Sequence, residues 1–140
     1  MIDVVSDASV VLKWFSDAHE EGVEPARELL TAHAEGTLAL HVLDLTAYEI
    51  GNALLRGRVG ASPRQVNVVL GALSEICPAI APTQEDLRLA IDLAAEHTLT
   101  VYDAAYGAVA RRRGALLATF DKELLRARLG ETPTAVLDKT

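Results

Sequence analysis

The sequence predicts an α/β fold in which a mostly parallel five-stranded sheet lies between two helical layers, as a three-layer α/β/α sandwich. Short apolar runs alternate with longer segments whose apolar residues recur at helical spacing. Strands that alternate with helices in this way form parallel sheets covered on both faces. The 140 residues, half of them hydrophobic, are enough for one core and too few for two ordinary domains. We therefore expect a single domain covering residues 1–140.

The five expected strands are short apolar runs bounded by turn residues. They cover residues 2–6, 38–42, 76–80, 115–119 and 135–137. Pro78 lacks the N–H that a central strand would need, so the third strand is expected at an edge of the sheet.

About seven helices are expected between these strands. They begin near residues 9, 25, 44, 62, 83, 102 and 121. Ser9 can cap the first helix, and Ser62 and Gln65 form a capping box around a proline at the first helical position. Gly130 is expected to end the helix that begins at Asp121.

The net charge of −7 argues against a protein that binds nucleic acid with its whole surface, because phosphate affinity comes largely from Lys and Arg. Any such contact must be local. Arginines cluster at 56 and 58, at 111–113, and at 126 and 128, although basic residues at helix ends are also favoured by the helix dipole.

The cellular compartment predicted from the sequence is the cytoplasm. No segment approaches the roughly 20 apolar residues that span a bilayer, and the first residues do not resemble a secretion signal. Cys77 is the single cysteine, so no internal disulfide can form, and it is expected to be a small buried hydrophobic residue.

Four acidic residues are expected at one rim of the sheet. Asp7 and Asp121 directly follow two predicted strands, whereas Glu49 and Asp103 lie near the starts of predicted helices. Each one alone could cap a helix or benefit from its dipole. Together they would repel one another unless a cation joined them, and an all-oxygen set of ligands suits Mg²⁺ or Mn²⁺.

The histidines offer no competing metal site. They are scattered along the chain, with none paired at the spacing of metal ligands on a helix, and we assign none to the site. These are His19, His33, His41 and His97.

Four short motifs resemble a known family. They are VSDASVVLKWF at residues 5–15, EIGNAL at 49–54, YDAAY at 102–106 and ATFDK at 118–122. Each motif is weak alone, but their order and spacing resemble the PIN domain of VapC-type toxins over nearly the whole chain. Every acidic residue of the family pattern is present.

The resemblance implies a PIN-like sandwich in which Asp7, Glu49, Asp103 and Asp121 hold Mg²⁺ or Mn²⁺. It also implies that Ser9, Asn52 and Thr119 support these acids by hydrogen bonding, as residues around metal ligands commonly do. Arg56 shares a helix face with Glu49 and Asn52, so we expect it to meet a substrate phosphate.

The implied activity is hydrolysis of RNA phosphodiester bonds by water that the metal activates. The resemblance further implies a homodimeric toxin, neutralised by a small VapB-like antitoxin. An arginine on the antitoxin would pair well with the carboxylates.

Two alternatives stay open. One is a receiver-type signalling domain, which also has an acidic metal pocket, although the adjacent acid pair and the lysine that it needs are absent. The other is a catalytically silent PIN fold that acts as a binding scaffold.

Overall fold

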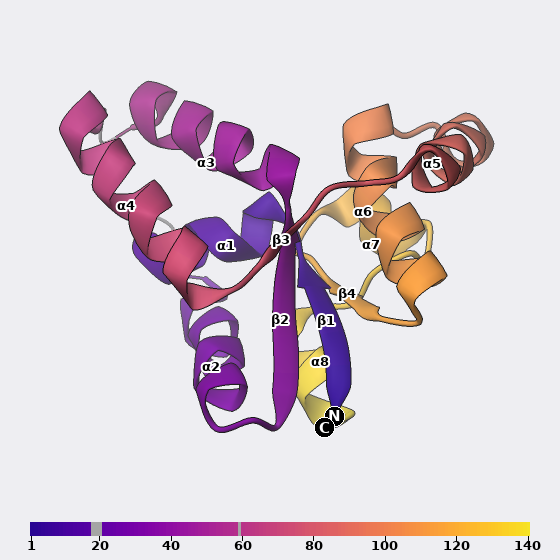
Figure 1. Cartoon of the computed structure of the whole chain (residues 1–140), viewed down its shortest axis with the longest axis horizontal. Coiled ribbons are helices and arrows are strands. Elements are labelled where there is room, and N and C mark those ends of the chain that lie inside the picture. The colour runs from indigo at the N-terminus through magenta and orange to yellow at the C-terminus, as the bar shows by residue number, and fades with distance from the viewer. Residues whose placement is uncertain (18–20, 59) are drawn as a thin grey trace.

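The computed structural model describes residues 1–17, 21–58 and 60–140. Four strands form one sheet in the order β3-β2-β1-β4, and every pairing is parallel. The strands are β1 (Ile2–Ser6), β2 (Leu38–Leu43), β3 (Ala79–Ile80) and β4 (Leu116–Ala118). In Figure 1 the sheet stands between two groups of helices, so the predicted class of fold is confirmed.

The described residues form eight helices. They are α1 (Ala8–Phe15), α2 (Val23–Ala34), α3 (Asp44–Arg56), α4 (Pro63–Ile76), α5 (Gln84–His97), α6 (Val101–Arg113), α7 (Lys122–Arg126) and α8 (Pro133–Asp138).

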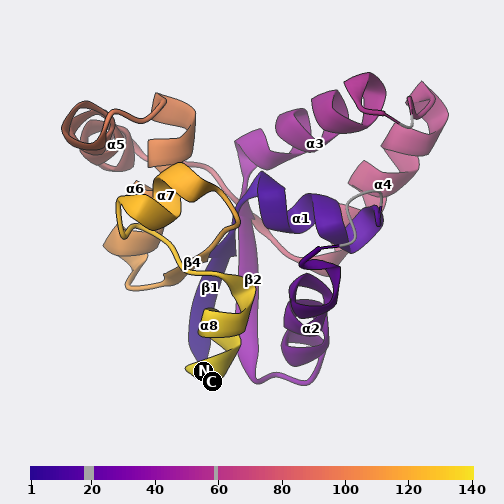
Figure 2. The same ribbon diagram turned by 180° about the vertical axis from the view of Figure 1, so that it is seen from behind.

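The alternation of side chains along the strands separates two hydrophobic cores. Val4 of β1 packs into a core with α1 to α4 and α8, whereas the next residue, Val5, packs into a core with α5, α6 and α7. Successive strand residues point to opposite faces, so both faces of β1 are buried. Figures 1 and 2 show these helical groups on either side of the strands.

Helix α6 is the central element of the second core. Its residues 104–110 are all buried, and most of them are Ala or Gly. A methyl group at Gly107 would lie 3.2 Å from Leu129, which indicates how closely the chain packs here. The small side chains therefore allow α6 to lie deep against its neighbours.

The C-terminal end of β1 lies at the middle of the sheet. β1 pairs with β2 on one side and β4 on the other, and the Asp7 amide donates to the Ala118 carbonyl at 3.2 Å. Ligands of parallel sheets bind beyond the carboxyl ends of such strands. Asp7 is thus placed where this rule expects a site.

The predicted fifth strand at residues 135–137 is wrong, because these residues belong to α8. The Thr132 side chain caps this helix by accepting from the Ala135 amide, and Pro133 occupies its first turn. Proline fits there because its missing N–H is not needed. Among the residues that the structure describes, a single parallel bridge, between Ala118 and Glu131, extends the sheet beyond β4.

The third strand lies at the predicted edge but is shorter than expected. Ile76 still belongs to α4, and β3 contains only Ala79 and Ile80, directly after Pro78. The edge position is confirmed.

The helix boundaries were predicted with mixed success. The capping box of Ser62 and Gln65 is confirmed, with hydrogen bonds of 2.8 and 3.2 Å. Ser9 as the first helix cap is wrong, because Asp7 accepts from the Val10 amide and Ser9 lies inside α1. Gly130 as the end of α7 is also wrong, since that helix already ends at Arg126.

Cys77 is buried, as expected, and burial raises the pKa of its thiol to about 11. Among the described residues, no helix is both long and apolar enough to cross a membrane.

Candidate active site

Asp7 is the most buried of the four acids, with 5% of its surface exposed. Its Oδ1 accepts from the Ser9 hydroxyl at 2.6 Å and from the Val10 amide at 3.3 Å, and its Oδ2 accepts from the Thr119 hydroxyl at 2.5 Å. Burial raises the pKa of Asp7 to about 6, although these hydrogen bonds oppose the rise. Asp7 is therefore a fixed carboxylate that would bind a proton or a cation readily.

The hydroxyls of Ser9 and Thr119 also join two distant parts of the chain. Ser9 Oγ accepts from the Phe120 amide at 2.9 Å, and Thr119 Oγ1 accepts from the Asp121 amide at 2.9 Å. Each hydroxyl thus donates to Asp7 and accepts from the loop after β4. This double link fixes the loop of Asp121 beside the end of β1.

Asp121 is the N-cap of α7. Its Oδ1 accepts from the amides of Glu123 and Leu124 at 2.8 and 3.1 Å. Its negative charge contributes to the raised pKa of both Asp7 and Asp103, so the three carboxylates lie within electrostatic reach of one another.

Glu49 lies in the second turn of α3 and is half-buried. Its Oε1 accepts from the Tyr106 hydroxyl of α6 at 2.6 Å. Burial raises the pKa of Glu49, and the charge of Asp103 adds to the effect. Glu49 therefore faces α6, the helix that also carries Asp103.

Asp103 lies in the first turn of α6, where the Thr100 side chain caps the helix by accepting from the Asp103 amide at 3.1 Å. Burial raises the pKa of Asp103, and the charge of Asp121 raises it further. A carboxylate at this end of a helix also meets the favourable end of the helix dipole.

The four acids form an electrostatic group without a basic partner. The charge of Asp121 raises the pKa of Asp7 and Asp103, and the charge of Asp103 raises the pKa of Glu49. Within the described residues, none of the four forms an ion pair with Lys, Arg or His. Buried like charges of this kind are costly unless a cation joins them. The donors are all carboxylate oxygens, the type that Mg²⁺ and Mn²⁺ prefer, so the residues fit such an ion.

Over the described part of the chain, no three acidic, histidine or cysteine side chains are arranged as ligands of one metal.

We expect the metal-free protein to lose stability as the pH rises from about 4 to about 6. The pKa of Asp7 is higher in the folded state than in the unfolded chain, so ionisation favours unfolding across this interval. Asp7→Asn removes this dependence. In thermal and denaturant unfolding with a chelator, the variant should gain about 2 kcal/mol over wild type between pH 4.5 and 7.5. A constant difference between the two proteins would contradict the burial of an ionisable Asp7.

Two residues expected at the site lie at its margin. Asn52 and Arg56 are exposed on α3, and in the described part of the chain Arg56 forms no ion pair with an acid. Arg56 lies seven residues beyond Glu49, which is about 10 Å along a helix.

The histidines lie elsewhere, as far as they are described. His33 bonds to backbone groups of Leu40 and Ile76, His41 pairs with Asp3, and His97 lies near Glu96. His19 falls outside the described residues.

Two site residues were not predicted from the sequence: Thr46 and Tyr106. The hydroxyls of these buried side chains lie 2.7 Å apart, and Tyr106 contacts Glu49. Their positions carried a signal, because Thr46 precedes Glu49 by three residues and Tyr106 follows Asp103 by three. Residues three apart share a helix face.

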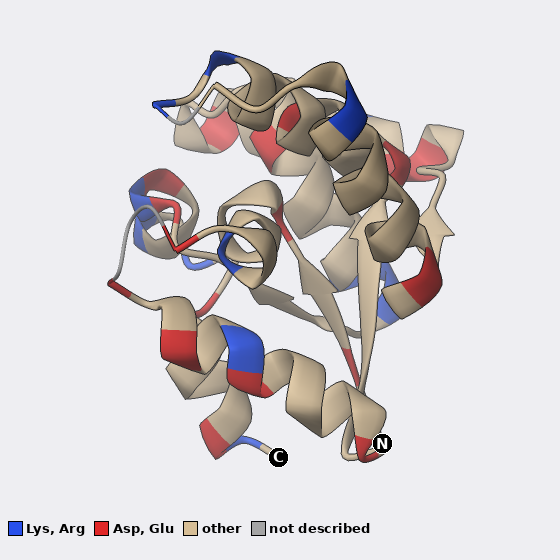
Figure 3. Ribbon diagram, turned by 90° about the vertical axis from the view of Figure 1, so that its left-hand side faces the viewer, with Lys and Arg blue, Asp and Glu red and all other residues tan. Residues whose placement is uncertain are grey.

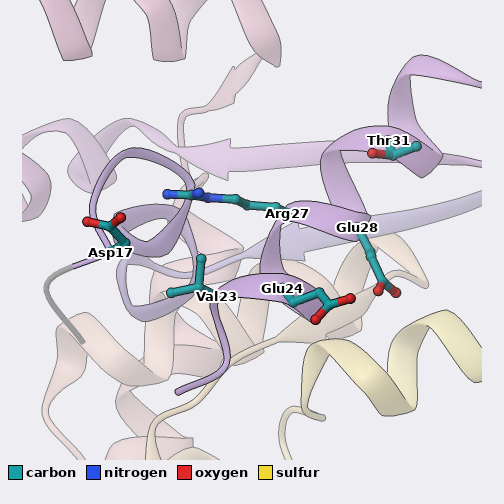
Figure 4. Close-up of a pocket in the computed structure, with 6 residues that line it drawn as sticks. All are labelled: Asp17, Val23, Glu24, Arg27, Glu28 and Thr31. Carbon is teal, nitrogen blue, oxygen red and sulfur yellow. The ribbon is translucent and has the colours of Figure 1, made fainter. Parts of the chain in front are cut away.

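A hollow of about 540 Å³ lies away from the acids, along α2. Figure 4 shows Arg27 extending from α2 towards Asp17, with Glu24 and Glu28 on the same helix. The Arg27 Nε donates to the Lys13 carbonyl at 3.0 Å. The hollow shares no residue with the acidic group, and we place the candidate site at the acids.

The family model and the similar proteins found by comparison agree with one another. Residues 4–129 match the family described as PIN domain. The chain is 35% identical over 125 residues to ribonuclease VapC3 of Pyrobaculum aerophilum, covering 86% of this chain and 91% of that protein. It is 37% identical over 119 residues to exonuclease VapC9 of the same organism, covering 72% of this chain and 85% of that protein.

Solved structures share the fold. A crystal structure of a Pyrobaculum aerophilum protein superposes with a TM-score of 0.71 at 26% identity, covering 99% of this chain and 94% of that one. A toxin-antitoxin complex from Klebsiella pneumoniae has a TM-score of 0.66 at 20% identity, covering 93% of this chain and 97% of that one.

Proposed function

The chain belongs to the PIN-domain family, and on this premise we propose that it is a metal-dependent ribonuclease that hydrolyses RNA phosphodiester bonds. The observation that carries the proposal is the group of four acids, connected by the charges of Asp121 and Asp103 that raise the pKa of the other members, with no basic partner among the described residues. The proposal treats residues 1–140 as one domain, acting in the cytoplasm.

We assign the metal site to Asp7, Glu49, Asp103 and Asp121. Mg²⁺ or Mn²⁺ bound there would activate water for in-line attack on phosphorus and offset the negative charge of the phosphodiester. Asp7 supplies the most rigid carboxylate, because three donors hold it and it is nearly buried. Ser9 and Thr119 orient that carboxylate, a role that neighbours of metal ligands commonly have.

We assign substrate contact to Arg56, with Asn52 between it and Glu49 on the same face of α3. Arg56 is exposed and therefore accessible to a phosphate group. On the face formed by α1 to α4, shown in Figure 3, segments with Lys or Arg alternate with segments with Asp or Glu. This distribution supports a local contact with RNA rather than a broad basic surface.

We propose that the physiological setting is a toxin-antitoxin pair, in which this chain is a homodimeric toxin bound by a small VapB-like protein. Support comes from the VapC relatives and from the shared fold of a toxin-antitoxin complex. An apolar groove of about 250 Å³ between α1, α3 and α4, lined by Leu12, Phe15, Leu54 and Val69 among others, could accept apolar side chains of the antitoxin. An antitoxin arginine could then pair with the carboxylates.

The receiver-domain alternative is not supported, because the chain matches the PIN family over residues 4–129. A silent PIN scaffold is the remaining alternative. It keeps the fold but predicts no RNA cleavage.

The test of the function is incubation of the purified chain with total RNA and Mn²⁺ or Mg²⁺, followed by mapping of the new RNA ends. We expect cleavage that requires the metal and stops when a chelator is added. The positions of the ends will show whether the chain cuts internally or from an end, a difference suggested by the names of its two relatives. If the RNA stays intact with both Mn²⁺ and Mg²⁺ although the protein is correctly folded, the result would favour a catalytically silent PIN scaffold.

A further inference from the structure

Tyr106 is a core residue whose polar end reaches the acidic site. Only 1% of its surface is exposed, and its ring packs in the hydrophobic core around α6. Its hydroxyl nevertheless donates to Glu49 Oε1 at 2.6 Å and lies 2.7 Å from Thr46 Oγ1. The charges of both Glu49 and Asp7 raise its pKa, so the hydroxyl lies near two of the acids.

The donor and acceptor of each hydrogen bond in this series follow from its two end groups, the Leu43 amide and the Glu49 carboxylate. The Leu43 amide can only donate, and it does so to Thr46 Oγ1 at 3.1 Å. Tyr106 has one O–H proton, which it gives to Glu49. The Thr46 hydroxyl must therefore donate to the Tyr106 oxygen. The resulting order runs from Leu43 through Thr46 and Tyr106 to Glu49.

This order connects a flexible acid to the rigid end of a strand. Leu43 is the last residue of β2, and Thr46 is fully buried. Glu49 has three rotatable bonds, is only half-buried, and is affected by the charge of Asp103. Without a donor, repulsion from Asp103 would favour rotamers that move the Glu49 carboxylate away from the other acids. The Tyr106 hydroxyl holds Oε1 and leaves Oε2 for another ligand.

We infer that Tyr106 is a positioning residue, which with Thr46 holds the Glu49 carboxylate in place for a divalent cation. The inference rests on the proposed metal-dependent function. It adds Thr46 and Tyr106 to the site, and neither residue belongs to the set of four acids. Tyr106 acts through Glu49 and does not itself contact the ion.

The test is the affinity for Mn²⁺, measured by calorimetry on Tyr106→Phe and wild type. Neighbours of metal ligands typically contribute about ten- to a hundredfold to metal affinity, and we expect a loss in this range. Tyr102→Phe is the matched control, because it removes the same hydroxyl from an exposed residue of the same helix, and its affinity should equal wild type. Equal affinity of Tyr106→Phe and wild type would overturn the inference.

A second measurement separates positioning from a general effect on the fold. In the Glu49→Gln background, Tyr106→Phe should weaken Mn²⁺ binding much less than in wild type, because the residue on which it acts is already changed. Thr46→Ser should bind as wild type, whereas Thr46→Val should show part of the Tyr106→Phe defect. Additive losses from Tyr106→Phe and Glu49→Gln would mean that Tyr106 does not act through Glu49.

The outcomes also distinguish the two proposals. If wild type binds Mn²⁺ and cleaves RNA while Tyr106→Phe binds equally well, only the positioning role fails. If folded wild type neither binds Mn²⁺ nor cleaves RNA, the proposed function and the positioning role fail together.

Discussion

Replacing Asp7 by asparagine is expected to lower Mn²⁺-dependent RNA cleavage by more than about a hundredfold and to leave the fold intact. Asp7 is the most buried of the four acids, and both of its oxygens are held by donors. The substitution removes the negative charge that a cation requires. It keeps the size of the side chain, so the packing at the end of β1 is preserved.

The hydrogen bonds around residue 7 should survive this change. The asparagine oxygen can still accept from Ser9 and from the Val10 amide. Its NH₂ group can donate to Thr119 Oγ1, which has two lone pairs and in wild type accepts from the Asp121 amide. This hydrogen bond is then reversed, and the Thr119 proton loses Asp7 as its acceptor. Asp7→Asn should therefore unfold at the same temperature as wild type or a higher one when no metal is present.

The measurement is initial rates of cleavage at saturating Mn²⁺, together with circular dichroism of the same samples. Asp92→Asn is the control, because Asp92 is exposed on α5 and outside the acidic group. It should cleave as wild type does. An Asp7→Asn protein that cleaves RNA at the wild-type rate would remove Asp7 from the catalytic site.

The second large effect is on stability. At a Mn²⁺ concentration of 100 times the dissociation constant, binding to the folded state should add about 2.7 kcal/mol to the free energy of unfolding. For a chain of this length, that corresponds to an increase of about 9 °C in Tm. Asp103→Asn should show a much smaller increase, because it removes one of the acids while preserving the start of α6.

Thermal unfolding over a Mn²⁺ titration gives this result directly, with Asp92→Asn again as the control. The approach needs no RNA substrate, so it tests the metal site separately from the reaction. Equal increases in Tm for wild type and Asp103→Asn would show that the ion binds elsewhere or that Asp103 is not a ligand.

The placement of the acids could be predicted because parallel sheets obey a simple rule. Side chains that follow parallel strands gather at one edge, and Asp7 and Asp121 follow β1 and β4, which pair directly. The same rule placed Glu49 and Asp103 only coarsely, since both lie within helices. Their proximity became clear from the contact of Glu49 with Tyr106, three residues after Asp103 on α6, and from the charge of Asp103, which raises the pKa of Glu49.

The errors had local causes. The apolar residues 135–137 fit a short strand as well as a short helix, and the cap provided by Thr132 with Pro133 was not recognised. Ser9 and Asp7 are both good helix caps, and sequence alone does not show which side chain meets the free amides. In the structure Ser9 instead bonds to Asp7 and to the Phe120 amide.

Tyr106 was missed for a different reason. Its ring packs in the hydrophobic core, whereas its hydroxyl contacts Glu49. The spacing of apolar residues in a sequence predicts the buried ring but not the partner of the hydroxyl. The pairing with Thr46 connects residues that are 60 positions apart. Such a contact depends on how α3 and α6 meet, which helical periodicity does not give.

The link between Asp7 and Thr119 has a consequence for when a newly made chain can assemble its acidic group. The two residues are separated by 112 positions, so Asp7 is synthesised long before its partner. At about 5–20 residues per second, the interval is roughly 6–22 s. During that time Asp7 lacks both the hydroxyl that orients it and the neighbouring Asp121, so a ribosome-bound nascent chain cannot assemble the four acids. A PIN domain of this design cannot complete its group of four acids until residue 121 has been made.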